Sequence, residues 1–171
     1  MARPLVVNAL ELLRRPGSHK DVSLDVAPVD IELDQEERLV PDAPIAVRIE
    51  CSSTNDGIVV DGSVAVQYRG VCRRCLRPVE GERTIEMHEL YQETRTDPDA
   101  FPIENDQIDL RSMVRESILL DVPEAPLCRS DCPGLCPVCG VDLATETCSC
   151  ETSSVDPRWS VLSELRDSLP E

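Results

Sequence analysis

The distribution of cysteine is the feature that most limits what this chain can fold into. Six of its nine cysteines fall within the 23 residues from 128 to 150, and this stretch has no hydrophobic periodicity. A segment so short cannot bury a core of its own, so another interaction must hold its conformation. Two of the remaining cysteines form a C-x-x-C pair, Cys72 and Cys75, and the last is Cys51.

The cellular compartment decides what these thiols can do. No apolar run is long enough to span a bilayer, and the N-terminus lacks the charged-then-apolar pattern of a secretory signal. We therefore expect a cytoplasmic protein with no membrane contact, whose thiols stay reduced. In such a compartment, clustered cysteines indicate metal binding rather than disulfide bonds.

The spacing of the cysteines points to zinc. A C-x-x-C turn directs two sulfurs at one ion, and this occurs at Cys72–Cys75 and again at Cys136–Cys139, where Gly140 lets the backbone curl around the metal. Four further thiols lie close by, so the predicted ligands are Cys72, Cys75, Cys128, Cys132, Cys136, Cys139, Cys148 and Cys150. Eight sulfurs make two sites of four. Because four thiolates leave no open coordination position, we expect structural Zn²⁺.

Two partitions of these ligands are open. The local partition, which we favour, closes the last four cysteines into one knuckle and joins the Cys72–Cys75 pair to Cys128 and Cys132. The alternative joins the two C-x-x-C pairs and leaves the other four thiols together. Cys51 falls on the apolar face of a strand and is expected to be a buried core thiol, whereas His19 and His88 stand apart from other ligands.

Alternating apolar residues predict an antiparallel β-meander. The alternation covers residues 45–51, 58–68 and 85–91, with a turn signal at Asn55-Asp56-Gly57, and an extended, turn-rich segment at 21–44 precedes it. We expect an α+β fold in which this meander forms a twisted sheet or open barrel. A few helices and a Cys-rich C-terminal segment stapled by zinc complete it.

Three helices are expected. The first follows Asn8 as cap and ends at Pro16-Gly17. The second follows Asp106 or Asp109, carries the stripe Leu110, Met113, Val114 and Ile118, and ends before Pro123. The third begins at Asp156-Pro157 and carries the stripe Trp159, Leu162, Leu165 and Leu169. The predicted organisation is a β core over residues 1–92, an acidic linker over 93–107, and a C-terminal part over 108–171.

The charge distribution indicates which class of macromolecule the chain can bind. With 33 acidic and 17 basic residues the formal charge is −16, which disfavours broad coating of nucleic acid and suits a basic protein partner. One cluster reverses this sign, namely Arg69, Arg73, Arg74 and Arg77 around the first C-x-x-C pair. These arginines either offset thiolate charge or form a small basic tip that contacts RNA or another partner.

Taken together, these motifs resemble the YceD family, the large ribosomal RNA subunit accumulation proteins of bacteria and plastids. The resemblance is carried in order by VCRRCLRP at 71–78, IDL at 108–110, CPGLCPVCG at 132–140, the pair Cys148 and Cys150, and DPR at 156–158. Ala144-Thr145 departs from the family pattern. The resemblance implies a role in accumulation of 23S ribosomal RNA and brings no catalytic reaction with it.

The leading hypothesis is therefore a non-enzymatic accessory factor of large-subunit biogenesis. It would support 23S rRNA accumulation or processing by binding precursor rRNA, a basic large-subunit ribosomal protein, or both, and would take no small-molecule substrate. The alternative is a zinc-thiolate redox or metal-responsive regulatory protein, in which thiolate oxidation ejects zinc and releases a partner.

Overall fold

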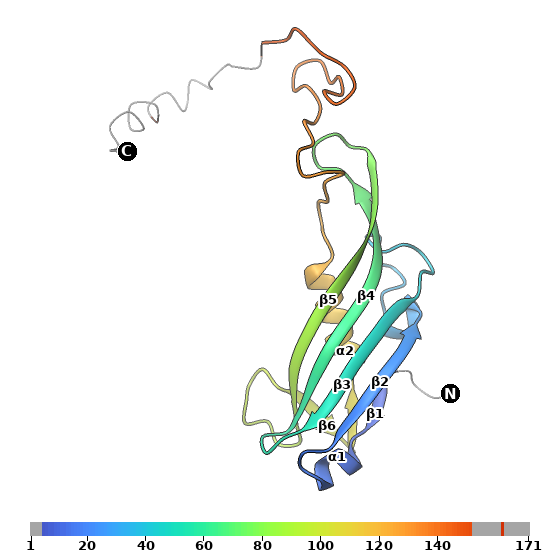
Figure 1. Ribbon diagram of the computed structural model, residues 1–171, viewed down its shortest axis with the longest axis vertical. Helices are drawn as coiled ribbons and strands as arrows, with labels where there is room; N and C mark the ends of the chain where they lie inside the picture. The colour runs from blue at the N-terminus through green and yellow to red at the C-terminus, as the bar shows by residue number, and fades with distance from the viewer. Residues whose placement is uncertain (1–4, 152–161, 163–171) are drawn as a thin grey trace.

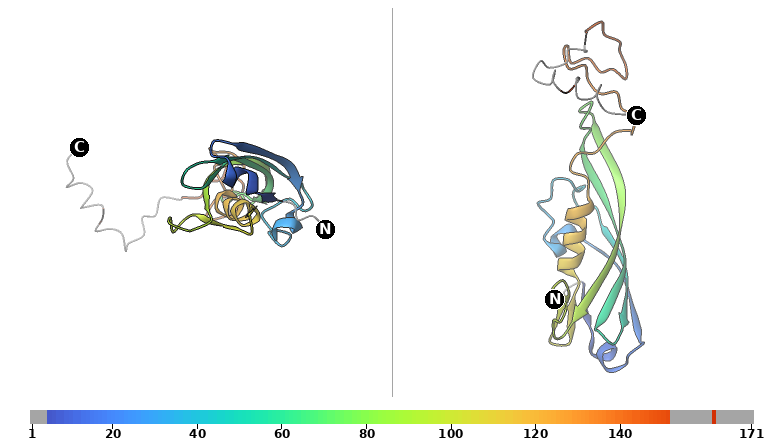
Figure 2. Two further views of the ribbon diagram at one scale, coloured as in Figure 1. Left: turned by 90° about the horizontal axis from the view of Figure 1, so that it is seen from below. Right: turned by 90° about the vertical axis from the view of Figure 1, so that its left-hand side faces the viewer.

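The computed structural model describes residues 5–151 and residue 162, and within them a curled seven-stranded sheet dominates. The strands are β1 (Val6–Asn8), β2 (His19–Val26), β3 (Ile45–Ser53), β4 (Ile58–Val71), β5 (Pro78–Gln92), β6 (Phe101–Glu104) and β7 (Gln107–Asp109). The helices are α1 (Leu10–Arg14), the 3-10 turn η1 (Pro28–Ile31) and α2 (Arg111–Asp121). Figure 2, seen along the long axis, shows the sheet curling around α2 as a half-barrel.

The strand order is β1-β7-β6-β5-β4-β3-β2. Strands β2 to β5 are successive antiparallel neighbours, so the predicted α+β class and its β-meander are confirmed. The sheet is nevertheless mixed, because β6 pairs with β5 in parallel, with Tyr91 opposite Phe101. This pairing continues the sheet into the short strands β6, β7 and β1 (Figure 1).

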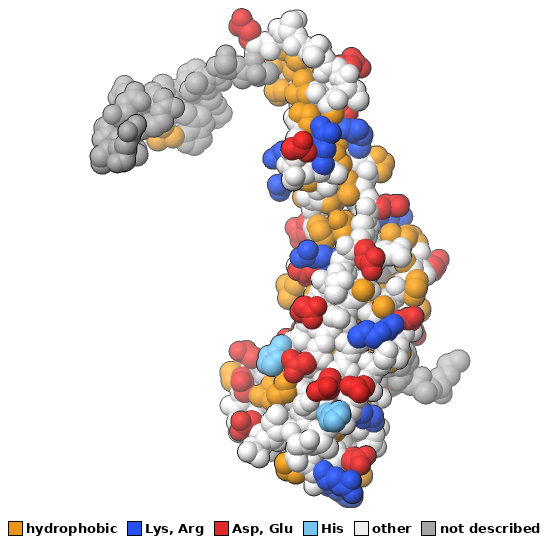
Figure 3. Space-filling view, in the orientation of Figure 1, with side chains coloured by type: hydrophobic (Ala, Val, Ile, Leu, Met, Phe, Trp, Pro, Cys, Tyr) orange, Lys and Arg blue, Asp and Glu red, His pale blue; other side chains and the backbone are white. Residues whose placement is uncertain are grey.

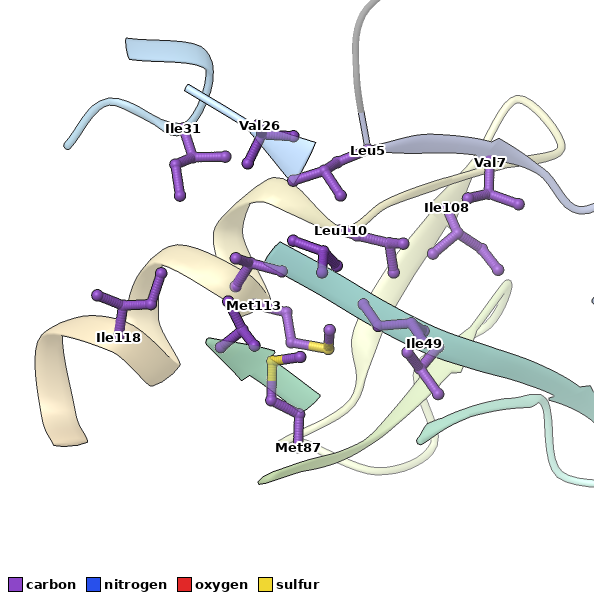
Figure 4. Packing of buried hydrophobic residues seen from close by; sticks show 14 of the residues in the cluster. Leu5, Val7, Val26, Ile31, Ile49, Met87, Ile108, Leu110, Met113 and Ile118 are labelled. Carbon is purple, nitrogen blue, oxygen red and sulfur yellow. The ribbon is translucent and has the colours of Figure 1, made fainter. Parts of the chain in front are cut away.

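The core lies between the concave face of the sheet and α2. On β3 the buried side chains are Ile45, Val47, Ile49 and Cys51, each no more than 4% exposed. They face the predicted stripe of α2, since Leu110, Met113, Val114 and Ile118 are all at most 1% exposed. Figure 4 shows Met113 lying against Met87 of β5 and Leu110 above Ile49. Each such side chain contributes about 1.5–3 kcal/mol on leaving water.

Both α-helices begin one residue later than a cap at Asn8 or Asp109 predicts: the N-caps are Ala9 and Leu110, and neither makes a side-chain capping hydrogen bond. Asn8 Oδ1 accepts the N–H of Leu10 at 3.0 Å, and α1 follows directly. Neither Asp106 nor Asp109 is the N-cap of α2, but Asp109 lies directly before that N-cap and its Oδ1 accepts the N–H of Arg111 at 3.0 Å. α2 ends at Asp121, two residues before Pro123, as a proline requires.

The segment 93–107, expected as an acidic linker, contributes to the sheet instead. It contains β6 and reaches the first residue of β7, and the two strands pair as a hairpin. Asn105 and Asp106 make the turn in the left-handed region, with φ of 52° and 58°, a two-residue turn that matches the twist of a hairpin. A strand of four residues is too short to establish an alternation, which is why periodicity missed it.

The hairpin of β4 and β5 is much longer than the rest of the sheet. Its strands span 14 and 15 residues, and only their lower halves carry α2 (Figure 1). The upper halves project away from the body and end in the turn at 72–77. This projection separates the cysteine-rich region from the hydrophobic core of the body.

Candidate metal centres at the hairpin tip

The end of the β4–β5 hairpin and the segment 123–151 together form a structure that we call the tip. After α2 the chain runs back along the hairpin and wraps over its turn (Figure 1). Backbone hydrogen bonds fix it there: the N–H of Arg73 donates to Pro126 O at 3.0 Å, and the N–H of Leu135 donates to Arg74 O at 3.1 Å. Gly134, with φ of +81°, sits so close to the Arg74 carbonyl that a Cβ would lie 3.0 Å from its oxygen.

Four of the predicted ligands meet in an inner cluster, formed by Cys72, Cys75, Cys128 and Cys132. Their sulfur atoms all lie within 4.8 Å of one another. The sulfurs of Cys72 and Cys132 are 3.8 Å apart, and those of Cys75 and Cys128 are 3.6 Å apart. Tetrahedral zinc with Zn–S bonds of about 2.3 Å places its sulfurs about 3.8 Å apart, whereas a disulfide needs about 2.05 Å. The donor set therefore fits a tetrahedral metal ion.

The other four thiols, of Cys136, Cys139, Cys148 and Cys150, form an outer cluster and also lie within 4.8 Å of one another. This is the grouping of the local partition. The alternative would require the Cys72–Cys75 and Cys136–Cys139 pairs to share one ion, and the structure places them in separate groups. Each cluster combines one C-x-x-C turn with two cysteines from later in the chain.

The two C-x-x-C turns have the same backbone geometry. In each, the N–H of the first cysteine donates to the carbonyl of the fifth residue after it at 2.8 Å, and its own carbonyl accepts the N–H of the fourth at 2.9 Å. The fourth residue adopts a left-handed conformation in both turns. The residues concerned are Cys72, Leu76 and Arg77 in the inner turn and Cys136, Gly140 and Val141 in the outer turn. This repeated geometry directs paired sulfurs toward one point.

Backbone N–H groups favour the thiolate form at the start of each turn. Donors at Cys128 and Cys75 lower the pKa of Cys72 to about 5. In the same way, donors at Cys139 and Val138 lower the pKa of Cys136 to about 6. Thiolates are the form of cysteine that binds metal, so both turns are prepared to bind a cation.

The last thiols of the two clusters show the opposite shift. Desolvation of its sulfur and the neighbouring sulfur of Cys132 raise the pKa of Cys128 to about 12. The hydrogen bond with Cys139 and burial do the same to Cys150, whose pKa is also raised to about 12. Four sulfurs so close together cannot all carry charge unless a cation compensates them, and a divalent metal supplies that compensation.

The clusters differ in solvent access. In the inner cluster Cys72, Cys75 and Cys132 are no more than 4% exposed, and Cys128 is exposed. Val79, Leu127 and Leu135 pack against them and form a small hydrophobic core of their own. In the outer cluster only Cys136 is buried, while Cys139 is exposed and the remaining two are half-buried. The inner cluster is thus the more protected of the two.

The arginines predicted as contact residues have different surroundings. Arg74 Nη1 donates to Cys132 O at 2.9 Å, so this side chain joins the hairpin turn to the later segment. Arg77 Nε donates to Cys75 Sγ at 3.4 Å and forms an ion pair with Asp142 at 3.4 Å. Both side chains therefore support the clusters.

The remaining two predicted arginines are less tightly held. Arg69 Nε donates to the carbonyl of Glu37 at 3.1 Å. Arg73 is exposed, and its side chain makes no hydrogen bond or ion pair within the described part of the chain. Sequence reasoning missed Arg129, which pairs with Asp131 at 3.3 Å beside the inner cluster. Its position next to Cys128 is the signal that could have found it.

Other residues singled out from the sequence lie away from the tip. Cys51 is buried, as expected, and burial raises the pKa of its thiol to about 11. His19 and His88 are exposed, and His88 is paired with Asp61. The predicted C-terminal helix lies outside the described residues except for Leu162, which is 52% exposed. Among the described helices, none combines the length and apolar character needed to cross a membrane.

Comparisons with known proteins agree with this picture. The sequence model of the family described as "Large ribosomal RNA subunit accumulation protein YceD" matches residues 60–166, which include all but the first two residues of the long hairpin, together with α2 and all eight clustered cysteines. An uncharacterised protein of Mycobacterium tuberculosis is 35% identical over 175 residues, which cover 96% of this chain and 83% of that protein. No solved structure gives a significant match.

Two further relatives extend the comparison. An uncharacterised protein of Mycobacterium leprae is 32% identical over 173 residues, covering 95% of this chain and 77% of its own length. A protein of Arabidopsis thaliana, named large ribosomal RNA subunit accumulation protein YCED homolog 1, chloroplastic, is 30% identical over 69 residues, covering 40% of this chain and 22% of its own. The family match extends over more than half of the sequence, and on this ground the chain belongs to the YceD family of large ribosomal RNA subunit accumulation proteins.

Proposed function

We propose that this chain is a non-catalytic accessory factor of large-ribosomal-subunit biogenesis, and that its tip contacts precursor 23S rRNA. Membership of the YceD family supports the ribosomal part of the proposal. The contact itself rests on one observation: the exposed Arg73 lies at the end of the projecting hairpin without a partner among the described residues. A guanidinium in this position is available to a phosphate.

The distribution of charge makes the tip the part of the molecule that RNA can approach. The chain as a whole carries a formal charge of −16, which repels phosphates. Figure 3 shows several basic side chains gathered at the base of the tip, whereas acidic side chains dominate the sheet below. Contact through the projecting tip keeps the acidic body away from the nucleic acid.

We further propose that each cluster holds one structural Zn²⁺. The sulfur spacing of the inner cluster and the shared geometry of the two turns support this. When bound, zinc would neutralise thiolate charge and link chain segments that are distant in sequence. The residues themselves position the arginines: Arg74 and Arg77 contact the clusters, which leaves Arg73 projecting outward.

A basic ribosomal protein is a second candidate partner, and it would bind the acidic sheet instead. On the outer face of the sheet Asp21 lies opposite Glu50, and Glu50 lies opposite Asp61. Three carboxylates in one row across adjacent strands repel one another, and a basic partner would relieve that repulsion. This candidate uses a different surface from the tip, so both partners could bind together.

The regulatory alternative has its support in the outer cluster. Cys139 is exposed there, and Cys148 and Cys150 are half-buried, so an oxidant could reach these thiols more easily than the three buried thiols of the inner cluster. Mild oxidation that released one zinc ion reversibly, together with a partner, would favour this function over a constant structural role.

Crosslinking in cells tests the main proposal. The chain is expressed as wild type, as Arg73→Gln/Arg129→Gln, and as Arg48→Gln, the last a control on the sheet where Arg48 pairs with Asp25. We expect ultraviolet crosslinks to large-subunit precursor RNA that the double variant reduces severalfold and the control leaves unchanged, with lower 23S rRNA in cells that carry only the double variant. Crosslinks to other RNA alone, with normal 23S rRNA, would contradict the proposal.

A further inference from the structure

Leu76 has a conformation that its residue type disfavours. Its φ is +60°, in the left-handed region where a β-carbon crowds the backbone. The equivalent position in the outer turn is Gly140, with φ of +76°, which has no β-carbon to crowd. Because the two turns share their hydrogen bonds, glycine would meet the geometric requirement at position 76 as well. The geometry of the turn therefore does not explain why a leucine occupies this position.

Packing against the described residues does not account for the side chain of Leu76. The Leu76 side chain is 62% exposed, and the apolar side chains that pack against the inner cluster are those of Val79, Leu127 and Leu135. Leu5 makes the comparison clear, since it also has a positive φ, of 67°, but is only 3% exposed and belongs to the main core. For Leu5, burial of the side chain in the main core compensates for the disfavoured backbone conformation. A disfavoured conformation that presents an apolar side chain to solvent indicates a binding role instead.

The surroundings of Leu76 define what it could bind. Val71, at the end of β4, is 57% exposed, and Arg73 and Arg77 lie in the same six-residue turn as Leu76. Arg77 is held by Cys75 and Asp142, whereas the guanidinium of Arg73 has no partner among the described residues and can meet a ligand. Apolar and cationic groups therefore stand side by side on a turn whose backbone is fixed by its hydrogen bonds.

This combination fits unpaired RNA better than a duplex. The phosphates of any RNA attract arginine, but only unpaired nucleotides expose the flat, apolar faces of their bases. In a duplex those faces are stacked inside the helix, and its deep, narrow major groove admits no side chain. The chain contains four aromatic residues in total, of which Tyr91 and Phe101 stack on each other at the opposite end of the hairpin from the tip. Tyr68, the remaining aromatic among the described residues, packs against the main core. Within the described part of the tip, an aliphatic side chain is thus the group available to cover a base.

We propose that Leu76 packs on an unpaired base of the RNA while Arg73 contacts a neighbouring phosphate, so that the tip prefers single-stranded to double-stranded RNA. The inference rests on the proposed function, since it assumes that the tip binds RNA. It adds the class of RNA that is bound and the residue that selects it.

Binding by the full-length, zinc-loaded chain tests this. Fluorescence anisotropy is measured with a labelled unpaired 12-nucleotide RNA and with the corresponding duplex, at one fixed salt concentration. We expect wild type to bind the unpaired RNA at least about tenfold more tightly, and Leu76→Gly to lose about tenfold of that affinity without a change toward the duplex. Leu76→Gly suits the turn, so its zinc content should equal that of wild type. Leu120→Ala, which trims an 87% exposed leucine on α2, is the control and should bind as wild type does.

The outcomes separate the two proposals. Equal wild-type affinity for unpaired and duplex RNA, unchanged in Leu76→Gly, would overturn this inference and leave RNA binding at the tip intact. Failure of wild type to bind either RNA would overturn the proposed function as well. If Leu76→Gly lost zinc, Leu76→Asn would replace it, because asparagine tolerates the left-handed region and also removes the apolar surface.

Discussion

The thiol of Cys72 lies 3.8 Å from that of Cys132, although 60 positions separate them in the sequence. The first belongs to the turn of the long hairpin and the second to the segment after α2. Together with Cys75 and Cys128, whose sulfurs are 3.6 Å apart, they hold the segment after α2 against the turn of the long hairpin.

Zinc content should fall in steps as the clusters are removed one at a time. We expect about two zinc ions per wild-type chain. Cys136→Ser/Cys139→Ser should retain about one, because the inner cluster has its own ligands and its own apolar core. Metal analysis of the purified chain measures this, with Cys51→Ala as the control that should keep both ions. A wild-type value near zero would refute the metal sites.

Removal of metal should unfold the tip and leave the body folded. The buried residues of the sheet and α2 form one hydrophobic cluster, and those around the inner cysteines form another. Without zinc, the second contains too little apolar surface to hold 123–151 in place. Hydrogen exchange after treatment with a chelator should lose protection at 123–151 and at 72–77 and keep it in β3 and α2. Global loss of protection would show that the body depends on the metal.

Arg73 and Arg74, adjacent in sequence, should respond differently to substitution. Arg74→Gln removes the hydrogen bond to Cys132 O and should destabilise the tip by about 1 kcal/mol, seen as faster release of zinc to a chelator. Arg73→Gln should release zinc at the wild-type rate, because its side chain supports nothing within the described residues. It should instead weaken the salt dependence of RNA binding. The slope of log K plotted against log salt concentration should become less steep by about 0.7, the effect of one lost phosphate contact on a single strand. Identical behaviour of the two variants would argue against the distinction.

Cys51 should behave as an inert thiol. Burial raises its pKa to about 11 from an ordinary value of 9.0. At pH 8 the metal-free chain, with its tip unfolded and its body folded, should therefore react with iodoacetamide at the eight clustered cysteines, and Cys51 should react only after denaturant is added. Peptide mass spectrometry identifies the modified positions. Rapid modification of Cys51 in the folded chain would contradict its burial.

The raised pKa of Cys51 also predicts how the stability of the protein changes at alkaline pH. Between pH 9 and pH 11 the unfolded chain loses a proton from Cys51 that the folded chain retains. Stability should therefore fall as pH rises through this interval, and Cys51→Ala should fall less steeply over the same range. Denaturant unfolding of the metal-free body at several pH values measures the difference.

Much of the fold could be predicted because its signals are local. The alternation from Ile45 to Cys51 specifies a strand with one buried face, and the stripe of Leu110, Met113 and Ile118 specifies a helix with one buried side. The position of Asp109 indicates the start of this helix to within one residue, and its Oδ1 accepts the N–H of Arg111. The spacing of the cysteines likewise made metal the leading hypothesis, since a C-x-x-C turn needs only four consecutive residues to direct two sulfurs at one point.

Other features depend on contacts between distant parts of the chain, and no local pattern encodes them. Strands β6 and β7 are too short to show a period, and β6 joins the sheet only because β5 presents an edge to it. The grouping of the cysteines required the hairpin turn and the segment after α2 to meet. That meeting depends on the length of β4 and β5 and on the path of the chain beyond α2.

The arginines around the first C-x-x-C pair show which properties follow from the local sequence and which follow from the tertiary structure. Sequence by itself determined that a basic cluster surrounds these thiols on an acidic chain. Only the tertiary structure decided that Arg74 and Arg77 support the clusters and that Arg73 projects outward. The physical reason is that charge and spacing are properties of neighbouring residues, whereas a partner such as the Cys132 carbonyl is brought to a side chain by folding.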